Sequence, residues 1–199
     1  MMTKQDLASA RIFRLAGFDA ASRPVSTRGR EGYGIAAPLL YKGEPCGEIA
    51  DYGDGGAPRV DVWGPEGCRK AFEACVEEAR QVFLAAEPPA EGVDDEQKKV
   101  REYIAKEQAE RSLFEYLDFR YRTLREAKAK TVFIDRNATT DDFVGGQGVR
   151  QLPKHAVSDE TRRYVAQKYP GWALAVDLVS ETEAGAPVYK RVRGKKGAA

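Results

Sequence analysis

The feature that most constrains this chain is a run of helix-forming residues from Asp94 to Lys130 that contains neither proline nor glycine. Asp94 and Asp95 supply an N-cap and negative charge at the positive end of the helix dipole. Such a helix would be about 55 Å long at about 1.5 Å per residue, which is longer than the core that a chain of this size can build.

The apolar stripe along this predicted helix has a gap. Val100, Tyr103 and Ile104 begin the stripe, the polar segment AKEQAERS at 105–112 interrupts it, and apolar residues resume it from Leu113. A helix without a continuous apolar face packs against a core only in part. The middle of the helix is therefore expected either to lie in solvent or to form a surface for a partner.

Short apolar segments separated by turns precede this helix and predict a small antiparallel sheet. YGIAAPLLYKG favours a strand by its length and flanking glycines, and a turn at 42–45 leads into a second strand. APRVDVWG alternates and predicts a third strand. After Pro65, apolar residues recur at helical spacing as far as the proline pair at 88–89. Residues 1–22 contain a short amphipathic segment, and residues 23–31 read as a polar loop.

The last third predicts a compact unit. KTVFID and WALAVDLV read as strands, Ser158 as the N-cap of a helix that stops at 170–171, and APVYKRVRG as a final strand. The expected fold is therefore α+β, with a small antiparallel N-terminal sheet, long central helices and a compact C-terminal α/β unit. The expected parts are residues 1–87, 94–130 and 131–199.

The net charge of +1 conceals an uneven distribution. Residues 44–96 contain fourteen acidic and four basic residues, a net charge of −10, whereas residues 111–130 contain six basic and three acidic residues, a net charge of +3. The stretch FRYRTLREAKAK interleaves basic residues with Phe119 and Tyr121. Basic groups bind phosphates and aromatic rings stack on bases, so these residues are candidates for contact with nucleic acid or with a partner.

These candidate binding residues lie on the long helix and in the basic tail: Arg111, Arg120, Arg122, Arg125, Lys128, Lys130, Lys190, Arg191, Arg193, Lys195 and Lys196. A solvated helix face with a loose tail is the alternative explanation. The acidic stretch 44–96 supports a different interpretation, in which it mimics nucleic acid and binds a basic protein partner.

Signals for catalysis are weak. Asp51 with Asp54, or Asp135 with Asp141 and Asp142, offer hard oxygen ligands for Mg²⁺ in a nuclease-like site, but aspartate also favours turns. The cysteines and the single histidine lack the closely spaced pair typical of structural zinc, and buried thiols explain the cysteines equally well. The four residues concerned are Cys46, Cys68, Cys75 and His155. No catalytic residue, metal or cofactor is assigned, and an enzyme is the less favoured class.

Two glycine-rich segments have a phosphate-binding or a catalytic interpretation. The cluster GDGG at 53–56 lies between two predicted strands, whereas phosphate-binding loops lead into a helix N-terminus, so a turn is favoured. Gly145-Gly146-Gln147 resembles the catalytic tripeptide of peptide-chain release factors, and a loop explains it equally well.

The chain lacks an apolar run of the roughly 20 residues needed to span a membrane, and its first residues lack the apolar segment of a signal peptide. An odd number of cysteines also argues against a secreted disulfide scaffold. We therefore expect a cytoplasmic protein without a membrane partner, and its oligomeric state stays open.

The stretch GYGIAAPLLYKGEPCGEIADYGDGG at 32–56 resembles small uncharacterised proteins encoded by phages and other bacterial mobile elements. The shared features are an apolar-Leu-Tyr strand, a Lys-Gly turn, a glycine before the next strand, an acidic Gly-Gly segment and a later KT-apolar-F strand at 130–133. The resemblance implies a non-enzymatic protein that occludes a host macromolecular complex, a protein or a ribonucleoprotein, such as a CRISPR defence effector. Direct DNA or RNA binding is the alternative, and a metal-dependent nuclease is the third.

Overall fold

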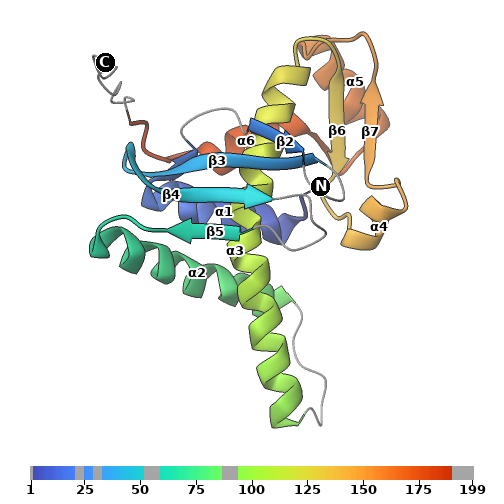
Figure 1. The fold of residues 1–199 in the computed structure, drawn as a ribbon. Coiled ribbons are helices and arrows are strands. Elements are labelled where there is room, and N and C mark those ends of the chain that lie inside the picture. Colours follow the sequence, from blue (N-terminus) through green and yellow to red (C-terminus); the bar gives the residue numbers. More distant parts are fainter. Residues whose placement is uncertain (1, 21–24, 29–32, 52–58, 87–93, 190–199) are drawn as a thin grey trace, which may run out of the picture.

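The structure is a computed structural model that describes residues 2–20, 25–28, 33–51, 59–86 and 94–189 (Figure 1). The fold is α+β, with a small antiparallel sheet near the N-terminus and long central helices, as the sequence predicts. The glycine cluster at 53–56 and the basic residues 190–196 lie outside the described residues.

The N-terminal sheet has the strand order β1-β3-β4-β5, and β2 pairs with the same strand β3. Its strands are β1 (Phe18–Ala20), β2 (Val25–Arg28), β3 (Tyr33–Tyr41), β4 (Glu44–Asp51) and β5 (Arg59–Val62). Lys42 and Gly43 both have positive φ, which closes the β3–β4 hairpin where the sequence predicts a turn. A side chain at Gly47 would overlap the backbone of Asp61, so glycine allows β5 to approach β4.

One expectation for this region is wrong, because the predicted loop at 23–31 contains the strand β2. Val25–Arg28 pairs antiparallel with Tyr33–Ala36 along an edge of the sheet. An edge strand is held by backbone hydrogen bonds to one neighbour, so polar side chains do not prevent it from forming.

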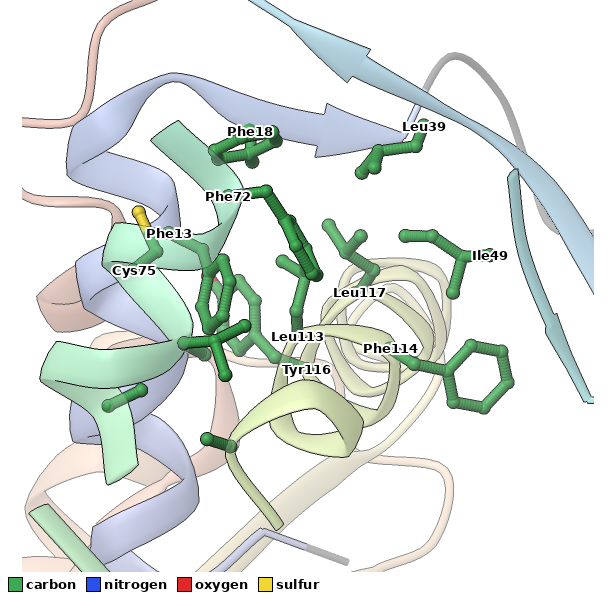
Figure 2. Packing of buried hydrophobic residues seen from close by; sticks show 14 of the residues in the cluster. Phe13, Phe18, Leu39, Ile49, Phe72, Cys75, Leu113, Phe114, Tyr116 and Leu117 are labelled. Carbon is green, nitrogen blue, oxygen red and sulfur yellow. The ribbon is translucent and has the colours of Figure 1, made fainter. Parts of the chain in front are cut away.

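Three helices cover one face of this sheet: α1 (Lys4–Ala16), α2 (Glu66–Ala86) and α3 (Asp95–Glu126). The rings of Phe13 and Phe72 are in tilted contact at 5.4 Å between centroids, and they pack with Leu39, Ile49 and Leu113 in the main core (Figure 2). Burial of these large apolar side chains is the dominant stabilising contribution.

Helix α3 begins at the predicted N-cap, where the Asp94 carboxylate accepts a hydrogen bond from the backbone N–H of Gln97 at 2.8 Å. It ends at Glu126, four residues before the predicted end. The polar segment at 105–112 does contribute to packing, because Ala105, Ala109 and Ser112 are buried. These small residues, spaced four and three apart, allow α1 and α2 to approach α3 closely.

The C-terminal unit is a three-stranded antiparallel sheet in the order β7-β6-β8 with short helices around it. Its elements are β6 (Thr131–Asp135), α4 (Thr140–Val144), β7 (Val149–Leu152), α5 (Asp159–Lys168), β8 (Trp172–Leu174) and α6 (Ala175–Glu183). Ser158 caps α5 as predicted. Gly145 lies at the end of α4 and Gly146 has positive φ, which is the geometry of a turn.

Two expected strands of this unit are wrong in the part that the structure describes. The apolar run at 172–179 forms only β8 before the chain turns into α6, whose buried residues Ala175, Leu178, Val179 and Thr182 recur at helical spacing. A short apolar run fits a strand and a buried helix equally well, and here the buried positions from Ala175 onward follow the helical period. Residues 186–189 of the predicted last strand form no strand.

Helix α6 joins the C-terminal unit to the rest of the molecule. It packs against α1 and α3, on the side of these helices away from α2 (Figure 1). The expected boundary near residue 131 is therefore crossed by a helix–helix contact. The N-terminal half of α3 extends past the edge of the sheet, where α2 packs against it (Figure 1).

Candidate partner-binding site

The extended half of α3 has exposed apolar side chains. Val100, Tyr103 and Ile104 are 53%, 62% and 47% exposed, respectively. The sequence predicts these three residues as the start of an apolar stripe, and in the structure they face solvent because Ala105 and Ala109 take the buried positions. We call the exposed surface formed by Val100, Tyr103 and Ile104 the arm patch.

A groove of about 700 Å³ runs beside the arm patch between β5, α2 and α3. Val60, Val62, Phe72 and Val76 provide its apolar lining, and Tyr103 belongs both to this groove and to the arm patch. A second groove, of about 500 Å³, lies between the end of α2 and α3 and includes Val100 and Ile104. Apolar surface of this kind beside a concave site is typical of a surface that binds a partner.

The charged residues around the larger groove balance. Four basic and four acidic side chains line it: Arg69, Arg80, Lys99 and Lys106, and Glu73, Glu77, Glu102 and Glu110. Arg80 bridges the two helices, at 2.6 Å from Glu77 and 3.6 Å from Glu102. A groove without net charge does not attract a polyanion, so its electrostatics favour a protein partner over nucleic acid.

The predicted basic residues on α3 and just after its end are largely neutralised by carboxylates of this helix. Arg122 lies 2.9 Å from Asp118 and Lys130 lies 3.0 Å from Glu126, and Arg111 pairs with Glu115. Arg125 lies 4.0 Å from Glu126 and stacks over Tyr121, whereas Lys128 is exposed. These residues therefore do not form the continuous basic face that a nucleic-acid-binding helix requires.

Arg120, another predicted contact residue, belongs to an ion network between helices. Its guanidinium lies 2.6 Å from Asp19 and 3.0 Å from Glu183, and Glu183 also pairs with Arg14 at 2.8 Å. Tyr116 donates a hydrogen bond of 2.7 Å to Glu183. The network ties α6 to α1 and α3, so Arg120 has a structural role.

Burial and hydrogen bonding act in opposite directions on Glu183. Burial alone would raise the pKa of Glu183, but the hydrogen bonds from Arg14 and Tyr116 and the two positive charges outweigh it and hold the pKa below its ordinary value. The pKa of Tyr116 is raised by burial and by its bond to the carboxylate. Glu183 is therefore ionised in the folded protein at neutral pH.

The carboxylates proposed for a nuclease site have other roles. Asp142 accepts hydrogen bonds from the backbone N–H and the hydroxyl of Thr139, the N-cap of α4, and Asp135 accepts one from the backbone N–H of Asn137. Within the described residues, no group of three or more histidine, cysteine, aspartate or glutamate side chains is arranged to hold a metal ion. Among the described residues, the structure thus does not bring together Asp135, Asp141 and Asp142 or the residues of the zinc alternative as a metal site, and Asp54 of the other nuclease pair lies outside the described residues.

The three cysteines are free and buried. Burial raises the pKa of the Cys46 thiol, and it raises that of Cys75 to about 12. Such thiols are protonated and unreactive at neutral pH. His155 is exposed, and its backbone carbonyl accepts a hydrogen bond from Thr131. The buried-thiol interpretation therefore fits the three cysteines.

Across the described part of the chain, none of the helices has the length and apolar character needed to cross a membrane. Comparison with protein-family models, with curated proteins and with solved structures found no match. The resemblance to phage and mobile-element proteins therefore stays a prediction from the sequence.

Proposed function

We propose that this protein is a non-catalytic binding protein that recognises a protein partner through the arm patch and the groove beside it. The observation that carries the proposal is the exposure of Val100, Tyr103 and Ile104 on a helix that extends beyond the sheet. Covering exposed apolar side chains of this size removes them from water, which stabilises the complex with the partner.

The groove favours one kind of occupant, an amphipathic helix of the partner. It lies between two helices, has an apolar lining and is bordered by equal numbers of basic and acidic side chains. An amphipathic helix places apolar residues in such a groove and matches the charges at its edges with its own. The walls are held in place, because Arg80 joins α2 to α3 and Arg101 donates to the backbone carbonyl of Leu84.

A finer proposal rests on the sequence resemblance. Proteins of phages and mobile elements that act inside a host gain from blocking host complexes, and a rigid protein that covers a surface does so without catalysis. We therefore propose that the partner belongs to a host macromolecular complex, such as a CRISPR defence effector. Cells with active CRISPR interference that express the chain should lose interference. Unchanged interference would reject this finer proposal and leave the arm patch to be tested separately.

Site-specific photocrosslinking tests the arm patch directly. A photoreactive phenylalanine analogue replaces Tyr103 in the arm patch or Gln167 on α5, which is an exposed position elsewhere. We expect a host protein crosslinked at position 103 and not at 167. Equal crosslinking at both positions would contradict the proposal. A crosslink between two copies of the chain would also contradict it, because the arm patch would then be a dimer interface and not a surface for another protein.

The identified protein is then purified and its affinity measured. The double variant Val100→Glu/Ile104→Glu places two charges in the arm patch, and Ala166→Glu/Gln167→Glu adds the same charges on α5. We expect the arm variant to bind at least about thirtyfold more weakly, since loss of central apolar anchors costs about 2 kcal/mol or more. The α5 variant should bind as wild type does, and equal affinities of all three proteins would refute the proposal.

A further inference from the structure

An aromatic cluster on the surface of the C-terminal unit is separate from the arm patch. Tyr164 on α5, Tyr169 just after α5 and Trp172 in β8 form a chain of rings, with centroid distances of 6.4 Å and 5.8 Å. Phe133 lies beneath them at 5.0 Å from Tyr169 and is only 1% exposed. We call Tyr164, Tyr169 and Trp172 the aromatic platform.

Two cationic side chains lie over these rings. The Arg150 guanidinium is 5.1 Å from the centroid of Tyr169 and 5.5 Å from that of Trp172. The Lys168 ammonium is 5.3 Å from the centroid of Tyr164 and 6.0 Å from that of Tyr169. These distances are those of cation–π interactions, so the platform concentrates positive charge beside flat aromatic surfaces.

The charges of Arg150 and Lys168 are not neutralised as those on α3 are. Both side chains are exposed, and within the described residues neither forms an ion pair with a carboxylate. The polar contact of Arg150 is a 3.4 Å hydrogen bond to the Tyr169 hydroxyl. Hydrogen bonding to Tyr164 raises the pKa of Lys168, so the ammonium is charged at neutral pH.

We propose that the aromatic platform binds single-stranded nucleic acid. The exposed ring of Tyr164 and the half-buried rings of Tyr169 and Trp172 accept one or two stacked bases. Arg150 and Lys168, which lie over these rings in the free protein, move aside to contact the flanking phosphates. Aromatic rings beside unpaired cations form the usual binding surface for single strands, because bases in a duplex are already stacked on one another. The site is too small for high affinity on its own, since stacking one base contributes roughly a factor of 5 to 150 in affinity.

This proposal goes beyond the protein-binding function and does not depend on it. If both hold, the arm patch contacts a protein while the platform contacts a nearby exposed strand, as in a ribonucleoprotein complex. If binding through the arm patch fails its test, the platform is still tested by its own measurement, because the two sites share no residue.

Tryptophan fluorescence reports on the platform directly. The chain has two tryptophans, so Trp63→Phe leaves Trp172 as the only one, and stacked bases quench indole emission. We expect oligo-dT and oligo-U of about 20 nucleotides to quench the emission of full-length Trp63→Phe at about 50 mM salt. Two phosphate contacts on a single strand predict about sevenfold weaker binding at about 200 mM salt. Absence of quenching at both salt concentrations, or equal quenching by a duplex, would overturn the proposal.

Charge variants in the same background separate the platform from non-specific attraction. Arg150→Gln and Lys168→Gln each remove one cation from the platform, and Arg59→Gln removes one exposed cation from β5, outside both proposed sites, as the matched control. We expect each platform variant to weaken binding at least about threefold and to reduce the salt dependence, with no change for Arg59→Gln. Tyr164→Ala, at an exposed ring, should also weaken binding. Equal effects of all three charge variants, or binding without Trp172 quenching, would place the contact elsewhere and refute the proposal.

Discussion

The two halves of α3 differ in what they present to solvent. In the C-terminal half, Leu113, Tyr116 and Leu117 are buried, and the basic residues on the exposed side are paired with carboxylates. In the N-terminal half, the buried positions hold small residues such as Ala105, and the larger apolar side chains face solvent. The large apolar side chains of the C-terminal half are thus mostly buried within the molecule, with Leu124 at 51% exposure as an isolated exception, whereas the N-terminal half leaves a group of them for a partner to cover.

This difference indicates that apolar side chains on one helix have different roles. A leucine in the C-terminal half contributes to folding, because it is removed from water when the chain folds. An isoleucine in the N-terminal half is removed from water only when a partner binds. Stability and binding measurements should therefore separate the two halves.

The largest expected effect is on stability and comes from the buried half. Leu113 is 0% exposed, so Leu113→Ala should lower the free energy of unfolding by about 2–5 kcal/mol through lost burial and a cavity. Ile104, 47% exposed on the same helix, should lose no more than about 0.5 kcal/mol when changed to alanine. Urea unfolding followed by circular dichroism measures both, and similar losses would mean that the arm patch is part of the folded core.

A second, smaller effect distinguishes two arginines that the sequence places in the same set of candidates. Arg120 links Asp19 to Glu183 between elements, whereas Arg122 forms an exposed pair with Asp118 one turn away. Arg120→Ala should destabilise the protein by about 2–3 kcal/mol, because it leaves partly buried carboxylates without a partner. Arg122→Ala should cost about 0.5 kcal/mol or less. Equal losses in urea unfolding would contradict the structural role of Arg120.

Much of the fold is predictable from the sequence, because turns, caps and periodicity act locally. Asp94 and Ser158 cap helices as predicted, and the turn at 42–45 closes a hairpin. The errors arise where tertiary contacts decide. Edge pairing turns the polar segment at 25–28 into a strand, and packing against α1 and α3 turns the end of the apolar run at 172–179 into a helix.

The candidate sites were harder to predict. The spacing of Ala105, Ala109 and Ser112 carries the signal that places the arm patch on the outside, but small residues add little to an apolar stripe. The aromatic platform has no sequence signature, since its rings come from α5, β8 and the turn between them, and Arg150 comes from β7. Such a cluster becomes visible only when the sheet and the helix are assembled.

The smallest expected effect is on the pH dependence of stability, which should have opposite signs for Glu115 on α3 and for Glu183, which binds α3 from α6. The pKa of Glu183 is lowered, so its ionised form stabilises the fold above its ordinary value of 4.5, and this contribution is lost as the pH falls through the lowered pKa. Burial raises the pKa of Glu115 despite its pair with Arg111, so ionisation of Glu115 opposes folding as the pH rises above 4.5.

Glutamine variants test the two signs by urea unfolding at pH 7 and at about pH 3. Glu183→Gln should be less stable than wild type at pH 7, and the difference should shrink at the lower pH, where Glu183 itself becomes neutral. Glu115→Gln should equal or exceed wild type at pH 7 by a few tenths of a kcal/mol, with no gain at the lower pH. If both variants lose stability at pH 7 to the same extent, ionisation of Glu115 stabilises the fold as that of Glu183 does. The pair of Glu115 with Arg111 would then stabilise the fold as the pairs of Glu183 do, and the distinction between the ion network and the pairs along α3 would fail.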